Sequence, residues 1–143
     1  TGITFETRSW GVARVWDLAP WAMGYTTRLL TGMLCYSEGD GIEYCRAAPK
    51  AWLDPGKRIR IEGLQTQFGP TSLVLEAARD RITGTIDVPS RHPLAHASLR
   101  LRVNGRVTSI RLNGKPAVFE KETGLVRLPA AGGRVTIEAR VRR

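Results

Sequence analysis

The sequence has few of the residues that build metal sites and disulfide frameworks. Its 143 residues include two cysteines, Cys35 and Cys45, and two histidines, His92 and His96. Two cysteines can form one bridge or remain two thiols, and the sequence leaves both states open. The histidines stand four residues apart, but Pro93 between them disfavours the helix that would bring both onto one face. We therefore expect no metal site and no cofactor, with both histidines in loops or facing solvent.

Long apolar runs are also missing, and acidic residues are scarce relative to basic ones. No stretch of about 20 apolar residues is present, so no membrane span is predicted. The opening TGITFETRSWG has no apolar segment typical of a signal peptide. Lysine and arginine total 22 against 13 acidic residues, a net charge of +9. This balance fits an anionic partner such as nucleic acid, acidic glycan or anionic lipid, and it also fits a solvated arginine-rich surface.

The composition and the spacing of apolar residues both change near residue 50. Before this point the chain is rich in aromatic residues, and Pro20 suits the first turn of a helix that Asp17 can cap. Apolar residues then recur with spacings near 3.6, which predicts one main helix over about 21–37, ending before Gly39. Because its apolar positions wrap widely, this helix needs a packing partner on more than one side.

After residue 50, short apolar alternations separated by turn residues predict β-strands. In SLRLRVNG, for example, Leu99, Leu101 and Val103 face one way, since side chains alternate along a strand. The segment TQFGPTSLVLEA likewise reads as a turn followed by a core strand. The eight predicted strands are 58–62, 71–77, 83–88, 97–103, 107–112, 117–120, 125–128 and 134–141.

Turn residues between these strands predict how they connect. Asn104-Gly105, Asn113-Gly114 and Gly132-Gly133 suit the positive φ angles of tight hairpins. The expected fold class is therefore mainly β, an antiparallel β-sandwich of about eight strands preceded by one main α-helix. We expect a helical segment over 1–50 and the sandwich over 51–143.

The order of these elements resembles a known arrangement. An amphipathic helix ends in the acidic turn SEGDG, and APKAWLDPGKRIRIEGLQTQFGPTSLVLEA, TGTIDVPSRHPLAHASLRLRV and VTSIRLNGKPAVF follow. Together they resemble the C-terminal region of bacterial six-hairpin, (α/α)6-barrel glycoside hydrolases, over nearly the whole chain. The last barrel helix of those enzymes leads into a β-sandwich that packs on the barrel.

The resemblance implies a C-terminal scaffold or accessory portion of a glycoside hydrolase-like protein. Catalytic carboxylates of such enzymes lie mostly in the barrel, so we assign no catalytic residue and do not expect this chain alone to be catalytic. The implied partners are a carbohydrate and a packing partner, either the barrel or a second copy of the chain. The first residue, Thr1, is not methionine, which suggests a processed product or a piece of a longer chain.

Rings beside a carboxylate are what a sugar subsite uses. Asp17 lies between Trp16 and Trp21, and Trp10 and Trp52 flank this region, so these five residues are the candidate carbohydrate-binding residues. The alternative is a helix cap at Asp17 with tryptophans buried in the core or in an interface.

Three further interpretations stay open. One concerns an acidic cluster around glycines, which either holds a cation or forms a solvated turn; its residues are Glu38, Asp40 and Glu43. A second takes Thr1 as a remote candidate for an N-terminal nucleophile. A stand-alone module that binds a glycan or an anionic polymer is the alternative function. It would use arginines on outward strand faces, and nucleic acid is disfavoured because no aromatic platform accompanies them. Those arginines are Arg100, Arg102, Arg111, Arg127, Arg140 and Arg142.

Overall fold

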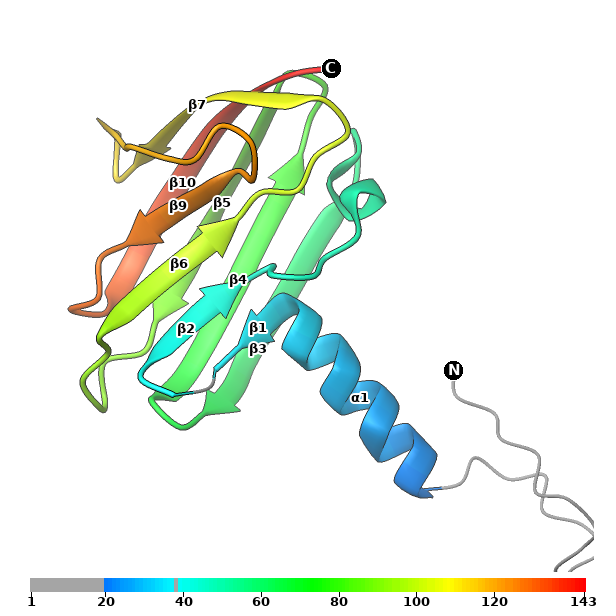
Figure 1. The fold of residues 1–143 in the computed structure, drawn as a ribbon, viewed down its shortest axis with the longest axis vertical. Helices are drawn as coiled ribbons and strands as arrows, with labels where there is room; N and C mark the ends of the chain where they lie inside the picture. The colour runs from blue at the N-terminus through cyan, green and yellow to red at the C-terminus, as the bar shows by residue number, and fades with distance from the viewer. Residues whose placement is uncertain (1–19, 38) are drawn as a thin grey trace, which may run out of the picture.

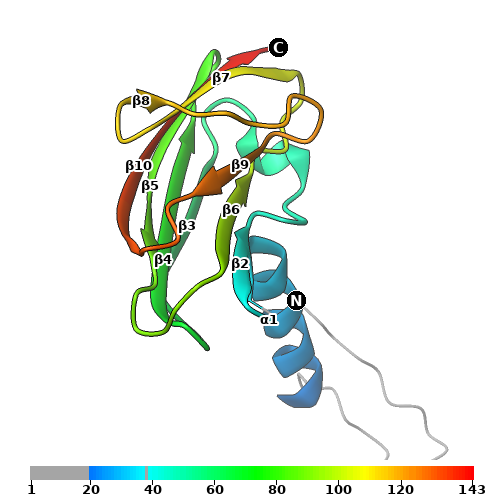
Figure 2. The same cartoon turned by 60° about the vertical axis from the view of Figure 1, so that its left-hand side comes forward.

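A computed structural model describes residues 20–37 and 39–143, with only the backbone described for residues 20–23. Two stacked sheets form a β-sandwich that follows one α-helix, which confirms the predicted fold class (Figure 1, Figure 2). The elements are α1 (Pro20–Leu34), β1 (Cys35–Tyr36), β2 (Gly41–Tyr44), the 3₁₀-helix η2 (Lys50–Leu53), β3 (Arg58–Thr66), β4 (Gly69–Ala77), β5 (Arg81–Val88), β6 (His96–Arg100), β7 (Arg106–Leu112), β8 (Lys115–Pro116), β9 (Leu125–Leu128) and β10 (Gly133–Arg142).

The helix α1 begins at Pro20, as its sequence suggested, but ends three residues earlier than predicted. Its end is set by sheet pairing, because the next two residues form β1 and pair antiparallel with β2. The last helical carbonyls are satisfied by the loop after β2. The amide of Cys45 donates to the Leu34 carbonyl (2.8 Å), and the amide of Ala47 donates to the Met33 carbonyl (3.2 Å). The helix therefore runs into the sheet without a linker.

The larger sheet has six strands in the order β3-β4-β5-β10-β7-β8, all paired antiparallel. The alternation of its strands is as predicted, with Leu73, Leu75 and Ala77 buried along β4. The Asn113-Gly114 pair makes the expected two-residue hairpin between β7 and β8, with φ angles of 50° and 76°. The strand predicted over 117–120 is wrong. The short strand β8 ends before it, at Pro116, and within 117–120 the structure has only an isolated bridge between Phe119 and Val126.

The smaller sheet has four strands in the order β1-β2-β6-β9. Neither β1 nor β2 was predicted, and β2 pairs parallel with β6 in a sandwich expected to be antiparallel. Two of the three expected hairpins are also wrong, because Asn104-Gly105 and Gly132-Gly133 lead from one sheet to the other. The division of the chain at residue 50 remains a prediction, and both strands before that residue belong to the sandwich.

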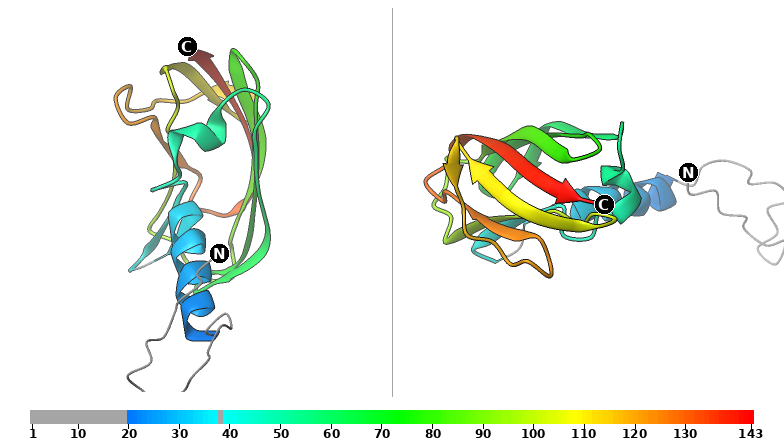
Figure 3. Two further views of the ribbon diagram at one scale, coloured as in Figure 1. Left: turned by 90° about the vertical axis from the view of Figure 1, so that its right-hand side faces the viewer. Right: turned by 90° about the horizontal axis from the view of Figure 1, so that it is seen from above.

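The core lies between the two sheets and is lined by the inward faces of both (Figure 3). Leu99, Leu101 and Val103 are all buried there, as their alternation predicted. At about 25 cal/mol per Å² of apolar surface, such burial is the main stabilising contribution. No helix in the described residues is long and apolar enough to span a membrane.

Candidate functional site

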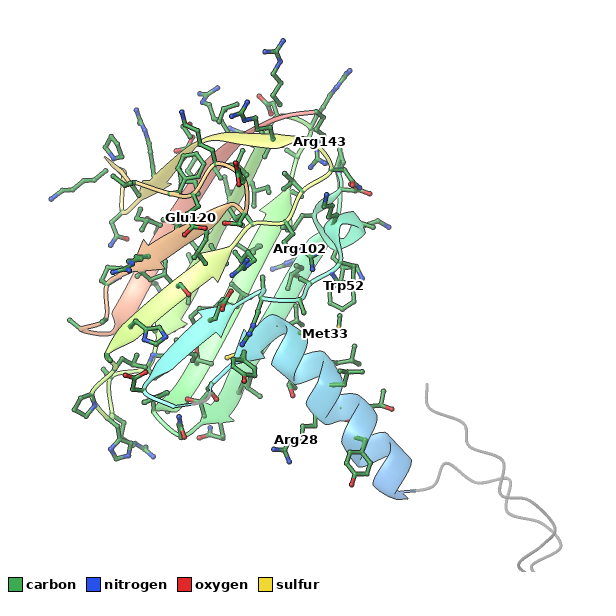
Figure 4. All side chains as sticks on the ribbon, viewed as in Figure 1. Arg28, Met33, Trp52, Arg102, Glu120 and Arg143 are labelled. Atoms are coloured by element: carbon green, nitrogen blue, oxygen red, sulfur yellow. The ribbon has the colours of Figure 1, made fainter. Side chains whose placement is uncertain are left out.

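The predicted carbohydrate-binding residues are only partly within the described structure. Trp10, Trp16 and Asp17 lie outside the described residues, and Trp21 lies in α1 at a position where only the backbone is described. Trp52 lies in η2, is half-buried, and packs against the core. Figure 4 shows it on the same side of the molecule as Met33, near the end of α1. A carbohydrate role for these five residues therefore stays a prediction.

An exposed apolar surface runs along α1. Tyr25 is 70% exposed and Leu29, one helical turn later, is 65% exposed, with Leu30 beside them at 43%. We call these three residues the helix face. The helix extends beyond the ends of the strands, and no described element covers the helix face (Figure 1, Figure 3). Large side chains left in water along one helix are typical of an interaction surface.

A basic cavity of about 340 Å³ lies at one end of the sandwich. One wall is the segment from Arg100 to Val107, which leaves β6 and enters β7, and the opposite wall is the turn 121–124. The loop after β2 and the first residue of η2 supply the rest of the lining. Six basic side chains surround the cavity, and Glu122 is the single carboxylate that the described residues place in its lining; the basic residues are Arg46, Lys50, Arg100, Arg102, Arg106 and Lys121.

Two of the six cations have an acidic partner at the edge of the cavity. Glu43 of β2 accepts a hydrogen bond from Arg100 Nε (2.8 Å) and lies 3.9 Å from Arg46 Nε. The guanidinium of Arg46 also lies over the ring of Tyr36, 4.3 Å from its centroid. Glu43 therefore belongs to an ion-pair network with two arginines, which argues against its use as a cation ligand. Glu38, which was considered with Asp40 and Glu43 for a cation site, lies outside the described residues.

The other four cations, Lys50, Arg102, Arg106 and Lys121, form no ion pair within the described part of the chain. Arg102 lies just after β6, between the buried Leu101 and Val103, and is itself half-buried in the lining of the cavity; Figure 4 labels its position. Arg106 lies opposite Arg142 in the β7–β10 pairing. Like charges in that position repel each other, so this end of the sandwich carries uncompensated positive charge.

Glycines allow the two walls to approach each other. Gly124 has φ +69°, and a side chain there would overlap the Leu101 carbonyl; the Leu101 amide donates to the Gly124 carbonyl at 3.0 Å. Gly105 has φ +122° and leaves no room for a Cβ beside the Arg142 carbonyl. Thr123 Oγ1 donates to Glu120 (2.7 Å) and fixes the turn. A backbone hydrogen bond and a side-chain contact within the turn thus hold the two cavity walls together.

The C-terminal arginine fixes the neighbouring loop. Arg143 donates to the Asn104 carbonyl (3.3 Å) and the Arg79 carbonyl (3.1 Å), and it pairs with Asp54 (3.4 Å). Asn104 in turn donates to Asp54 (2.9 Å). These contacts tie the loop that carries Gly105, a residue of the cavity lining, to the segment after η2.

The predicted arginine face is not continuous. Arg111, Arg140 and Arg142 lie in the six-stranded sheet, whereas Arg100 and Arg127 lie in the four-stranded sheet on the other side of the sandwich. Sequence alternation identified Arg100 and Arg102 as outward-facing. The sequence did not predict that these two arginines share a cavity with Arg46, Lys50 and Lys121. Those three residues come from separate segments that meet only in the folded chain.

The histidines and cysteines lie apart from the basic cavity and are not among its lining residues. His92 is exposed in a loop, and His96 lies at the exposed start of β6, with Nδ1 3.5 Å from Asp40. No group of three potential metal ligands is found in residues 20–37 and 39–143. Cys35 and Cys45 are free thiols, both buried, and burial raises the pKa of each to about 12. Such thiols stay protonated and unreactive near neutral pH.

Comparisons with known proteins identify no family. No family model matches the chain, and no curated protein is significantly similar to it in sequence. Among solved structures, an alpha-L-rhamnosidase from Dictyoglumus thermophilum is similar with a TM-score of 0.44 and 11% sequence identity. The similarity covers 71% of this chain and 11% of that chain. The chain thus spans a small fraction of that enzyme's length, and so weak a likeness assigns no function.

Proposed function

We propose that this chain is the C-terminal scaffold portion of a glycoside hydrolase-like protein and that it packs, through α1, on a helical catalytic body. The observation that carries the proposal is the helix face. Tyr25 and Leu29 are mostly exposed on a helix that extends beyond the sandwich. Burying each such side chain stabilises an interface by about 1.5–3 kcal/mol.

The proposed protein class and partner body come from the sequence resemblance to the last barrel helix and sandwich of six-hairpin glycoside hydrolases. The catalytic carboxylates would then belong to the partner body. Half of the carboxylates in the described residues pair with arginine, as Glu76 does with Arg58 and Asp87 does with Arg134. Glycoside hydrolysis instead uses two carboxylates that face each other across a substrate, about 5–10 Å apart.

The test is the mass of the native particle, from light scattering combined with mass spectrometry of its chains. We expect the chain to occur joined to, or bound by, a larger helical body that hydrolyses aryl glycosides, and the isolated chain to self-associate without hydrolysing them. A native particle that is a monomer of this chain alone would overturn the proposal.

Two variants test whether association depends on the helix face or on exposed apolar side chains in general. Tyr25→Glu with Leu29→Glu places two charges on the helix face and should abolish association while leaving the sandwich folded. Val118→Glu is the matched control, because Val118 is 96% exposed and lies near β8, away from α1. If the control dissociates the particle as strongly as the helix variant does, the helix face is not the contact.

A second candidate is a stand-alone module that binds a glycan or an anionic polymer. The basic cavity favours it, whereas the helix face does not. If this second function is correct, the chain is a monomer that a polyanion column retains and that salt releases.

A further inference from the structure

We propose that the basic cavity binds the oxyanion of a small ligand, that is, a carboxylate, sulfate or phosphate group. The inference does not depend on the packing role of α1, because the cavity lies within the sandwich and is built from its own loops. It also differs from a surface arginine face, because it assigns one concave site of defined residues.

The charge of the lining is the first argument. Six basic side chains and one carboxylate surround about 340 Å³, and four of the cations have no ion-pair partner in the described structure. Concave clefts lined by charge of one sign focus the potential and concentrate the counter-ion. An oxyanion held between Arg102 and Arg106 would offset the repulsion that Arg106 experiences from Arg142.

The shape of the cavity is the second argument. A volume of about 340 Å³ is within the range of small-ligand sites. Arginine can donate two parallel hydrogen bonds to a planar carboxylate or to a phosphate oxygen pair. The hydrogen bond between Leu101 and Gly124 and the contacts of Arg143 connect the cavity walls to one another and to the rest of the sandwich. Binding at a formed site loses less conformational entropy.

The chemistry of the lining also narrows the ligand. Among the described side chains, those of residues 24–37 and 39–143, no aromatic ring lines the cavity, so they offer neither a nucleobase nor the apolar face of a neutral sugar a ring to stack on there. Recognition must therefore rest on the charged group. An acidic saccharide, a sulfate ester and a phosphate ester share this group, and they are told apart by experiment.

The experiment follows backbone amides by heteronuclear NMR while sodium glucuronate, sodium sulfate or sodium phosphate is added to the full chain, with glucose as the neutral probe. We expect saturating shifts at residues 100–107 and 121–124 for the anions and none for glucose. Tighter binding of glucuronate than of phosphate would identify a carboxylated sugar as the source, and the reverse order would identify a phosphate ester. Absence of saturating shifts with all three anions would overturn the proposal.

Two charge-matched variants complete the test. Arg102→Gln with Arg106→Gln removes two cations from the cavity and should weaken binding at least about tenfold, which corresponds to about 1.4 kcal/mol. Arg111→Gln with Arg140→Gln removes the same charge from exposed positions on the six-stranded sheet and should change affinity less than about twofold. Equal losses in both variants would mean that net charge alone attracts the anion, and the assigned site would be wrong. Amide spectra of both variants report whether the fold is kept.

Discussion

The hydroxyl of Tyr44 on β2 lies 2.6 Å from the hydroxyl of Thr71 on β4, and this hydrogen bond joins the two sheets through the core. The direction of donation follows from the next contact. Thr71 Oγ1 donates its proton to the Asp87 carbonyl at 2.7 Å, so Tyr44 must be the donor to Thr71. Both side chains are buried, at 0% and 2% exposure. A buried polar pair of this kind must be fully satisfied to be tolerated.

Removing either hydroxyl should destabilise the fold by different amounts. In Tyr44→Phe the Thr71 hydroxyl still donates to the Asp87 carbonyl, so the free energy of unfolding should fall by only about 1 kcal/mol. Thr71→Val keeps the side-chain shape but strands the buried Tyr44 donor and should cost more, about 1–3 kcal/mol. The double variant should cost less than the sum of the single variants. Urea unfolding measures all three, and strict additivity would show that the two hydroxyls do not interact.

Buried thiols should make stability depend on pH at the alkaline end. Burial raises the pKa of both Cys35 and Cys45 from 9.0 to about 12, and for Cys45 the charge of Cys35 adds a smaller effect. Because the folded state holds these protons more tightly, their contribution is complete below about pH 9 and is lost as the pH rises from 9 towards 12. Unfolding free energies measured across this range should fall, and Cys35→Ala with Cys45→Ala should show a shallower fall despite lower overall stability.

The same burial predicts slow alkylation. Iodoacetamide at mildly alkaline pH should label neither thiol in the folded chain and should label both in urea. Mass spectrometry counts the added groups. Rapid labelling of the native chain would contradict the buried position of both side chains.

The carboxyl of Asp87 should titrate below its usual range. Arg134 donates to both of its oxygens, at 2.7 and 3.0 Å, and this contact lowers the Asp87 pKa. The stabilising contribution is present above the ordinary carboxyl pKa of 3.8 and is lost as the pH falls through the lowered value. Arg134→Gln should return the Asp87 pKa towards 3.8. NMR titration of the side-chain carboxyl follows the change, and an unchanged value would exclude Arg134 as its cause.

Two glycines should respond to alanine in opposite directions. A methyl group at Gly84 of β5 would overlap the Val74 carbonyl of β4, so Gly84→Ala should destabilise the fold by about 1–3 kcal/mol. Gly24 lies in α1, where an added methyl group would have no described neighbour within 4 Å, so Gly24→Ala should favour the helix by up to about 1 kcal/mol. Thermal unfolding of both variants checks the signs, and two shifts of the same sign would contradict the contrast.

Local pattern predicted the parts of this fold that local interactions decide. The alternation of Leu99, Leu101 and Val103 correctly predicted buried side chains, although β6 ends at Arg100 and not at the predicted residue 103. Asn113-Gly114 gave the correct hairpin, because a two-residue turn depends on the backbone angles of its own residues. The two short strands β1 and β2 were missed. On one side β2 pairs with β1, which has only two residues, and on the other with β6, more than 50 residues further along the chain. Strands of two and four residues show too little alternation to reveal them.

The candidate site follows the same division. Alternation identified Arg100 and Arg102 as outward-facing, but a cavity also needs the other segments that close it. Lys50, from η2, and Lys121, from the turn before β9, join those arginines only through the sheet order and the contact of Gly124 with Leu101. The helix face, by contrast, follows from local sequence. The apolar positions of α1 wrap widely around the helix, and this pattern alone predicted that the helix needs a packing partner.

The direct passage from α1 into β1 connects two surfaces of the molecule. Two amides, from Cys45 and Ala47, hold the final carbonyls of the helix, and β1 follows at once inside the sheet. Backbone hydrogen bonds therefore run without a break from the end of α1 through β1 and β2 to β6, the strand that leads into the basic cavity. The surface proposed for packing and the surface proposed for anion binding are thus built on one continuous sheet.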